Sequence, residues 1–235
     1  MIDNSGTSSK PITFTDYETG AMPTFSNPGV QWGHAVDIRA SWVIIDHFFA
    51  QNAHEAGIFI ASCSNNNIVR NSEITQAGSG VMLNGQYNLI TGNYAHDLTM
   101  IVNTSGGDDD YGAVEFWIYA PNNEISYNRC YNCKASSYDY GFDGGTVEIY
   151  TNGDNSHIHQ NWSENSQGFF EVGGGSAQNV GWLITSSTTP SIWHACTRED
   201  RLRRPFRVSD LKTIRPSTPM ADRCCCSAFA ASVPA

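Results

Sequence analysis

Three glutamates follow glycine-led apolar runs at similar positions along the chain. The runs read Gly112-Ala-Val-Glu115, Gly145-Thr-Val-Glu148 and Gly168-Phe-Phe-Glu171. Successive side chains of a strand point to opposite faces, so the apolar neighbours should point inward and each glutamate outward. Stacked strands would bring the carboxylates to about 4.8 Å per step. Carboxylates at such distances can serve as acid and base, or as acid and nucleophile, in glycoside hydrolysis.

Aromatic and cationic residues near these runs could bind a sugar chain. Trp117 and Tyr150 each follow a glutamate by two residues, so they should share its outward face and could stack on sugar rings. Tyr111, Tyr138 and Lys134 belong to two insertions, residues 103–111 and 134–143. Insertions on adjacent repeats would form one wall of a groove, and function is often placed on such loops. Lys134 is the candidate base if the reaction is an elimination.

Two aspartates, Asp110 and Asp143, each precede a glycine by two residues and could help bind calcium. Calcium prefers six to eight oxygen ligands, and this region is rich in carboxylates. Three interpretations of the glutamates stay open: a solvated surface, a catalytic pair, or a calcium site. Hydrolysis by paired carboxylates requires no cofactor, so calcium is a possible addition.

A repeat must position these residues, and the sequence contains one. An apolar residue followed three positions later by asparagine occurs as Ile68–Asn71, Ile90–Asn93, Ile125–Asn128 and Ile158–Asn161. This marker and the glycine-led runs keep one order and nearly one phase. Short strands between Asn and Gly corners bury a common core only when they stack as coils. We therefore predict an all-β solenoid, a parallel β-helix of about six coils, in which the four asparagines are structural.

Composition excludes several kinds of partner. The net charge is −10, and residues 1–180 contain 19 Asp or Glu but only five Lys or Arg. An acidic body repels nucleic acid and anionic membrane surfaces. The sequence shows neither a long apolar run typical of a membrane span nor a visible signal peptide. Cys130 should lie in the coil interior, because one C-x-x-C motif is weak evidence for zinc.

The pattern divides the chain into three parts. Residues 1–30 are a lead-in with the first strands, and residues 31–184 carry the repeat. Residues 185–235 break it with Arg201-Leu-Arg-Arg-Pro and three adjacent cysteines. We expect this last part to be an irregular or disordered tail or sequence foreign to the domain.

The stretch Asn4–Tyr17, followed by the Asn-rich coils, resembles right-handed parallel β-helix proteins of the pectate-lyase-like superfamily. The likeness covers about residues 4–183 and implies the hand of the solenoid, a polysaccharide or oligosaccharide partner, and an extracellular or periplasmic location. We expect a monomer. The superfamily includes hydrolases and lyases, so the reaction stays open. Glycoside hydrolysis is the first hypothesis, a calcium-assisted lyase with Lys134 or Arg129 as base the second, and a non-catalytic carbohydrate-binding β-helix the third.

Overall fold

The computed structural model describes residues 1–17 and 20–187 and is built from short strands. In this part of the chain, no helix is long and apolar enough to cross a membrane. The strands are β1 Ile12–Phe14, β2 Thr24–Asn27, β3 His34–Ile38, β4 Val43–Asp46, β5 Phe49–Ile60, β6 Ile68–Arg70, β7 Glu73–Leu83, β8 Leu89–Thr91, β9 Tyr94–His96, β10 Met100–Val102, β11 Tyr111–Gly112, β12 Val114–Ile118, β13 Glu124–Ser126, β14 Arg129–Tyr131, β15 Ala135–Ser137, β16 Gly141–Asp143, β17 Gly145–Ile149, β18 His157–Glu164, β19 Phe170–Val172 and β20 Gly181–Ser187.

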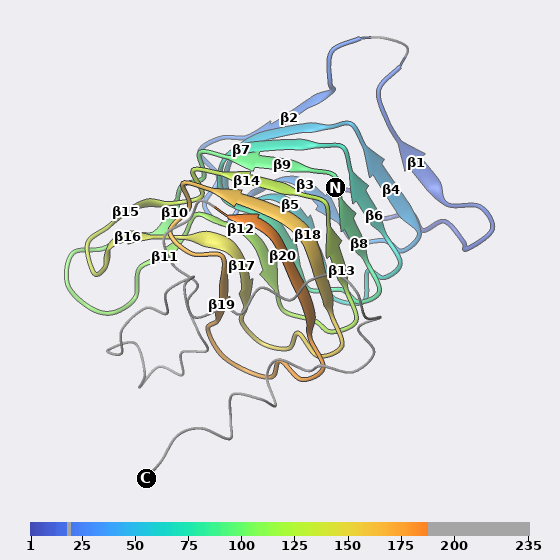
Figure 1. The fold of residues 1–235 in the computed structure, drawn as a ribbon. Coiled ribbons are helices and arrows are strands. Elements are labelled where there is room, and N and C mark those ends of the chain that lie inside the picture. Colours follow the sequence, from blue (N-terminus) through green and yellow to red (C-terminus); the bar gives the residue numbers. More distant parts are fainter. Residues whose placement is uncertain (18–19, 188–235) are drawn as a thin grey trace.

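The strands stack in parallel into three faces, which makes the molecule a right-handed β-helix, as predicted (Figure 1). The first face contains β1, β4, β6, β8, β13 and the start of β18. The second contains β2, the first parts of β5 and β7, then β9, β14 and the end of β18. The third contains β3, the last parts of β5 and β7, then β12, β17 and β19. Strand β20 pairs with β18.

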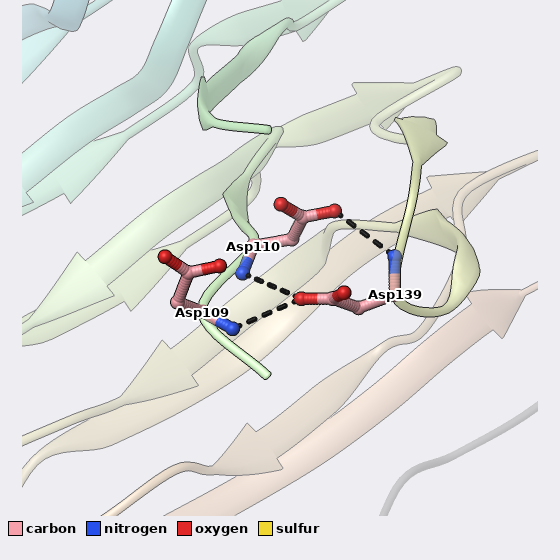
Figure 2. Close-up of side chains that lie close together, drawn as sticks. All are labelled: Asp109, Asp110 and Asp139. Carbon is pink, nitrogen blue, oxygen red and sulfur yellow. Dashed lines mark hydrogen bonds between the residues drawn. The ribbon is translucent and has the colours of Figure 1, made fainter. Parts of the chain in front are cut away.

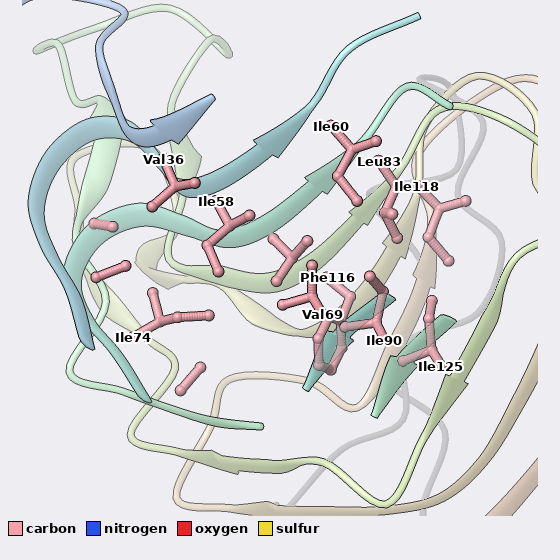
Figure 3. Packing of buried hydrophobic residues seen from close by; sticks show 14 of the residues in the cluster. Val36, Ile58, Ile60, Val69, Ile74, Leu83, Ile90, Phe116, Ile118 and Ile125 are labelled. Carbon is pink, nitrogen blue, oxygen red and sulfur yellow. The ribbon is translucent and has the colours of Figure 1, made fainter. Parts of the chain in front are cut away.

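One apolar core fills the space between the three faces. Figure 3 shows branched aliphatic side chains from successive coils, such as Val69, Ile90 and Ile125, stacked toward one another beside Phe116. All four are fully buried. The core also holds Cys130, as predicted, and a disulfide bond that was not predicted joins it to Cys133. Each coil therefore buries its apolar side chains against the other faces and against the coils above and below it.

Asparagine ladders run along two corners of the solenoid. The Asn93 backbone N–H donates to Oδ1 of Asn128 (2.9 Å), and the Asn128 backbone N–H donates to Oδ1 of Asn161 (3.0 Å). A second ladder, which was not predicted, runs from Asn67 through Asn88 to Asn123. All these side chains are buried, so each amide satisfies backbone groups that would otherwise be unpaired.

Asn71 does not belong to the ladder, so its predicted role is wrong. It is exposed, has a left-handed φ of 52°, and donates to Asp46 on the neighbouring coil. Ser72 takes the ladder position: its backbone N–H donates to Oδ1 of Asn93, and its Oγ accepts from Phe48 N. The corner of this coil is therefore shifted by one residue from the apolar-x-x-Asn pattern.

Two insertions lengthen the corner between the second and third faces. One carries the antiparallel pair β10–β11 and the other carries β15–β16. Figure 1 shows both projecting from the same edge of the solenoid. They therefore lie beside the outer surface of the third face, where the sequence places its glutamates.

The ends of the solenoid can be followed over the described residues. Strands β1 and β2 already pair in parallel with β4 and β5, so the lead-in belongs to the stack. Strand β20 continues to Ser187. The rest of the predicted irregular tail, residues 188–235, lies outside the described residues.

Candidate active site

The outer surface of the third face carries one straight row of side chains. Trp117 on β12 pairs in register with Glu148 on β17, and Glu148 pairs with Glu171 on β19. Phe59 and Met82 continue the row on the earlier coils. Two of the three predicted glutamates therefore do lie on neighbouring strands, while an indole occupies the place expected for the third.

Glu148 and Glu171 are both partly exposed and sit one strand spacing apart. They line one narrow hollow together with Asp143, which ends β16, and with the backbone of Gly144 and Gly145. Like-charged side chains directly opposite each other on neighbouring strands repel, and a shared proton, a bound cation or the partial exposure of both side chains to solvent would each reduce this repulsion. Two carboxylates in one hollow can supply the acid and the base, or the acid and the nucleophile, of a hydrolysis.

A glycine leaves room for one of the two carboxylates. A Cβ at Gly173 would collide with Oε1 of Glu148 and would lie 3.5 Å from Cδ2 of Tyr150. The Glu148 side chain therefore extends over the next coil, toward Gly173 and beside the Tyr150 ring. Any larger residue at position 173 would push the carboxylate away from this place.

Glu115 does not join the row, and its predicted outward position is wrong. Phe116 pairs with Val147, so Glu115 lies beside Thr146, whose hydroxyl donates to the buried Ser163 hydroxyl inside the solenoid (2.6 Å). Both Glu115 and Phe116 are fully buried. The corner before β12 turns two successive side chains inward, so strict alternation fails there.

The neighbours of Glu115 on earlier coils support this inward position. In the same register, Glu115 follows Gly80 and Gly57. A Cβ on Gly57 would collide with the Ile74 side chain, which belongs to the core. Glu115 therefore occupies a row that faces the interior on the coils to either side.

The Glu115 carboxyl is isolated as well as buried. Neither of its oxygens has a hydrogen-bond partner among the described residues. Burial raises the pKa of Glu115 well above its usual value, because the charged form would lose its hydration without gaining a partner. The group is therefore a neutral acid in the core, and it has no access to a substrate in this structure.

An aromatic cluster adjoins Glu148. Trp117 contacts Tyr111, Tyr119 and Tyr150, with ring centroids 5.5, 5.8 and 6.2 Å away. Trp117 is only 3% exposed, so its predicted stacking on sugar is wrong for this conformation: it supports the tyrosines that cover it. Tyr150 is 47% exposed and remains available to a ligand, and Tyr111 is half-buried.

Tyr119 is a member of this site that sequence reasoning missed. Burial raises its pKa, and the nearby charges of Glu148 and Glu55 raise it further. Its ring lies 5.5 Å from that of Tyr150. The signal was present, since Tyr119 follows Trp117 by two residues just as Tyr150 follows Glu148.

A second polar group on the same face was also missed. His34 Nε2 lies 2.8 Å from Glu55 Oε2, and the His34 ring stacks on Phe59 with centroids 4.2 Å apart. Asp37 lies on the other side of the imidazole, with its Oδ2 3.7 Å from Nδ1. The three residues come from two coils, so only the register of the solenoid brings them together.

The two insertions are fastened to each other by aspartates (Figure 2). Asp139 Oδ2 accepts from the backbone N–H of Asp109 (2.9 Å) and of Asp110 (3.2 Å). Asp110 accepts in turn from the Ser137 hydroxyl (2.8 Å), the Thr104 N–H (2.7 Å) and the Asp139 N–H (3.1 Å). Burial alone would raise the pKa of Asp110, but these hydrogen bonds outweigh burial and leave it lowered.

The structure places the two predicted calcium ligands, Asp110 and Asp143, at different sites. Asp110 lies with Asp109 and Asp139, whose oxygens are within 4.8 Å of one another, whereas Asp143 lines the hollow beside Glu148. The oxygens of Asp110 and one oxygen of Asp139 already accept hydrogen bonds from the loops. The cluster therefore holds the insertions together by itself, and calcium binding stays a prediction.

The remaining predicted binding residues lie on the insertions. Tyr138 is 69% exposed, and its backbone N–H donates to Asn103. The Lys134 ammonium donates to Oδ1 of Asn165 (2.6 Å) and lies 5.9 Å from the Phe142 ring centroid. Lys134 is thus held toward the following coil at the corner between the second and third faces.

Comparison with known proteins gives the family and a structural neighbour. Residues 34–196 match a family model described as a right-handed β-helix region. No curated protein sequence matches the chain. The fold is similar to an alginate lyase from Paenibacillus sp. str. FPU-7, with a TM-score of 0.41, 13% sequence identity, and coverage of 83% of this chain and 87% of that one.

Proposed function

The chain belongs to the family with a right-handed β-helix region, and on that premise we propose that it cleaves a polysaccharide by glycoside hydrolysis. The observation that carries the proposal is the register pair Glu148–Glu171 beside Tyr119 and Tyr150. Many chemistries share this scaffold, so the argument rests on the site and not on the fold.

The spacing of the pair favours a retaining mechanism. Carboxylates about 5–5.5 Å apart suit a covalent intermediate, whereas about 6.5–9.5 Å leaves room for a water molecule between them. Directly opposed residues on neighbouring strands lie near the shorter distance. A partner for Glu171 two coils away would have to be Glu115, which is inside the core.

Each carboxylate then has a role. Glu148 lies next to the tyrosines that would hold the sugar ring, so its carboxylate attacks the anomeric carbon while the bond to the leaving oxygen breaks. Glu171 gives its proton to that oxygen. In the second step water attacks the anomeric carbon, its proton returns to Glu171, and the bond to Glu148 breaks. Tyr150 stacks on the ring and Tyr119 positions Glu148.

The test begins with a panel of polysaccharides whose products are resolved by mass. Hydrolysis adds one water per cleavage, whereas elimination leaves an unsaturated end that absorbs in the near ultraviolet. Glu148→Gln and Glu171→Gln should each lower kcat by at least about 100-fold with an unchanged circular dichroism spectrum. Glu124→Gln is the matched control, because Glu124 is an exposed glutamate on the first face.

Rescue by azide separates the two roles. Glu171→Ala should recover turnover with added azide and give a glycosyl azide of retained configuration, while Glu148→Ala should give the inverted one. Unsaturated products, or full activity in either glutamine variant, would overturn the proposal.

A further inference from the structure

The outer side of the second face carries a row of aromatic and cationic side chains. Tyr94 on β9, Arg129 on β14 and Trp162 on β18 pair in register across three consecutive coils. They form a straight row on a flat sheet, on a different side of the solenoid from Glu148. We call Tyr94, Arg129 and Trp162 the second-face row.

The two rings hold the guanidinium between them. The Arg129 Cζ lies 5.2 Å from the Tyr94 ring centroid and 5.1 Å from that of Trp162. Such stacking fixes the planar fork and leaves its N–H edges free to donate. Among the described contacts, the nearest carboxylate to Arg129 is that of Glu164, at 3.5 Å.

Other cations of the acidic body are engaged more closely. Arg39 makes bonds of 3.0–3.2 Å to both oxygens of Asp37. Arg70 contacts Asp46 at 2.7 Å. Arg129 differs because aromatic rings hold its guanidinium, and its described ion pair, from Nη2 to Glu164 at 3.5 Å, is longer than those of Arg39 and Arg70. An arginine whose plane is fixed by rings and whose Nε and Nη1 make no described hydrogen bond is prepared to bind a ligand.

The surroundings match a neutral sugar better than an anion. Trp162 is 41% exposed, and Tyr131 and His96 lie in the adjoining outward row. Glu164 and Glu73 add acceptors at its edge, and their charges would repel an anionic group. Hydroxyl groups can use donors and acceptors together, while the ring faces take the apolar side of a pyranose.

We propose that the second-face row is a non-catalytic binding site for a neutral polysaccharide, with Trp162 as the stacking platform and Arg129 as the hydroxyl donor. The choice of ligand rests on the proposed function, while the location rests on the row itself. Bound there, a long chain would stay near the Glu148 face between cleavage events.

Affinity electrophoresis tests the site in a background that cannot turn over its ligand. The full chain carrying Glu148→Gln is run through native gels containing soluble β-glucan, xylan, galactan or mannan. At least one gel should retard it. Adding Trp162→Ala should weaken that binding about tenfold, and Arg129→Lys should weaken it less. Tyr127→Ala is the matched control, because Tyr127 is 59% exposed but lies outside the second-face row, at the corner between the first and second faces.

The outcomes separate this site from the proposed reaction. Retardation that is lost with Trp162→Ala and kept with Tyr127→Ala supports the row, even if the wild-type chain cleaves nothing. Thermal unfolding of each variant shows whether a loss of binding comes from a loss of fold, and Arg129→Lys keeps the charge if Trp162→Ala is unstable. No retardation in any gel, or equal retardation of folded Trp162→Ala, would overturn the proposal.

Discussion

Strands β12 and β17 carry the same sequence motif and use it in opposite ways. Gly-x-Val-Glu reads the same at positions 112–115 and 145–148. In β17 the glutamate reaches the outer surface beside Tyr150, whereas in β12 it is fully buried and has no described partner. The motifs are offset by two residues, since Phe116 pairs with Val147. A local motif therefore does not fix which side of a solenoid wall a residue takes.

The offset arises in the corner before β12. Gly112 and Ala113 have positive φ values of 144° and 55°, so they form the exit from the β10–β11 insertion and are not the start of the strand. A Cβ on Gly112 would collide with the backbone of Met100 and Ile101, which only glycine avoids. Gly112 and Ala113, which the motif predicts to begin the strand, therefore belong to the end of the insertion.

Activity gives the largest contrast between the two glutamates. We expect Glu148→Gln to lower kcat by about 100-fold or more, and Glu115→Gln to leave it within about twofold, because only Glu148 reaches the hollow. Initial rates on the cleaved polysaccharide measure both. Equal losses of kcat in the two folded variants would mean that Glu115 acts in catalysis, and would contradict the difference between the two glutamates.

The stability of the stacked coils should depend on the buried asparagine ladder. Asn128 accepts from the backbone N–H and side-chain Nδ2 of Asn93 and donates to Ile90 O and Asn161 Oδ1. We expect Asn128→Ala to lower the free energy of unfolding by about 2–4 kcal/mol, since several buried groups lose partners. Asn71→Gly is the control, because it keeps the left-handed φ at an exposed position and should cost less than about 1 kcal/mol. Urea unfolding measures both.

The buried carboxyl should respond to substitution in the opposite direction. Glu115→Met removes a polar group that has no described partner and should raise the free energy of unfolding by about 1–3 kcal/mol. Thermal unfolding at neutral pH is the measurement. A clear loss of stability would mean that Glu115 makes a favourable contact.

The pH dependence follows from the raised pKa of Glu115. Above the usual carboxyl pKa, the unfolded chain releases this proton while the folded chain retains it. The contribution of Glu115 to stability therefore falls as pH rises from about 4.5 toward the folded pKa. In Glu115→Gln that slope should flatten, and unfolding midpoints measured between pH 4 and 8 compare the two. An unchanged slope would contradict the burial of the Glu115 carboxyl in the folded chain.

The smallest effect is expected at the hydrogen bonds of Asp110 and Asp139 that join the two insertions. The lowered pKa of Asp110 means that its contribution is present above the usual carboxyl pKa and is lost as pH falls through the folded value. Asp110→Asn should speed hydrogen exchange in residues 103–111 and leave the unfolding temperature almost unchanged. Calcium at millimolar concentration should not slow that exchange; if it does so in the wild type and not in Asp110→Asn, the predicted calcium site is real.

The sequence predicted the architecture well because the solenoid repeats local chemistry. Asn93, Asn128 and Asn161 share one environment, so one rule places all three. Glu148 and Glu171 were placed correctly because Val147 and Phe170 before them pair in register. The prediction for Asn71 failed because its corner is shifted by one residue from the pattern. The prediction for Glu115 failed because its motif is offset by two residues from the motif of β17. The His34–Glu55 contact could not be predicted, since it depends on the rotation between coils.

The corners have a consequence for how such a molecule can change its length. Tyr94 pairs in register with Arg129, and Asn93 with Asn128 on the ladder. Removing residues 94–128 as one block would therefore join Asn93 to Arg129 with the ladder intact and place Asn161 next to Asn93. A protein of this kind can therefore gain or lose a complete turn while the backbone register of the remaining turns is kept.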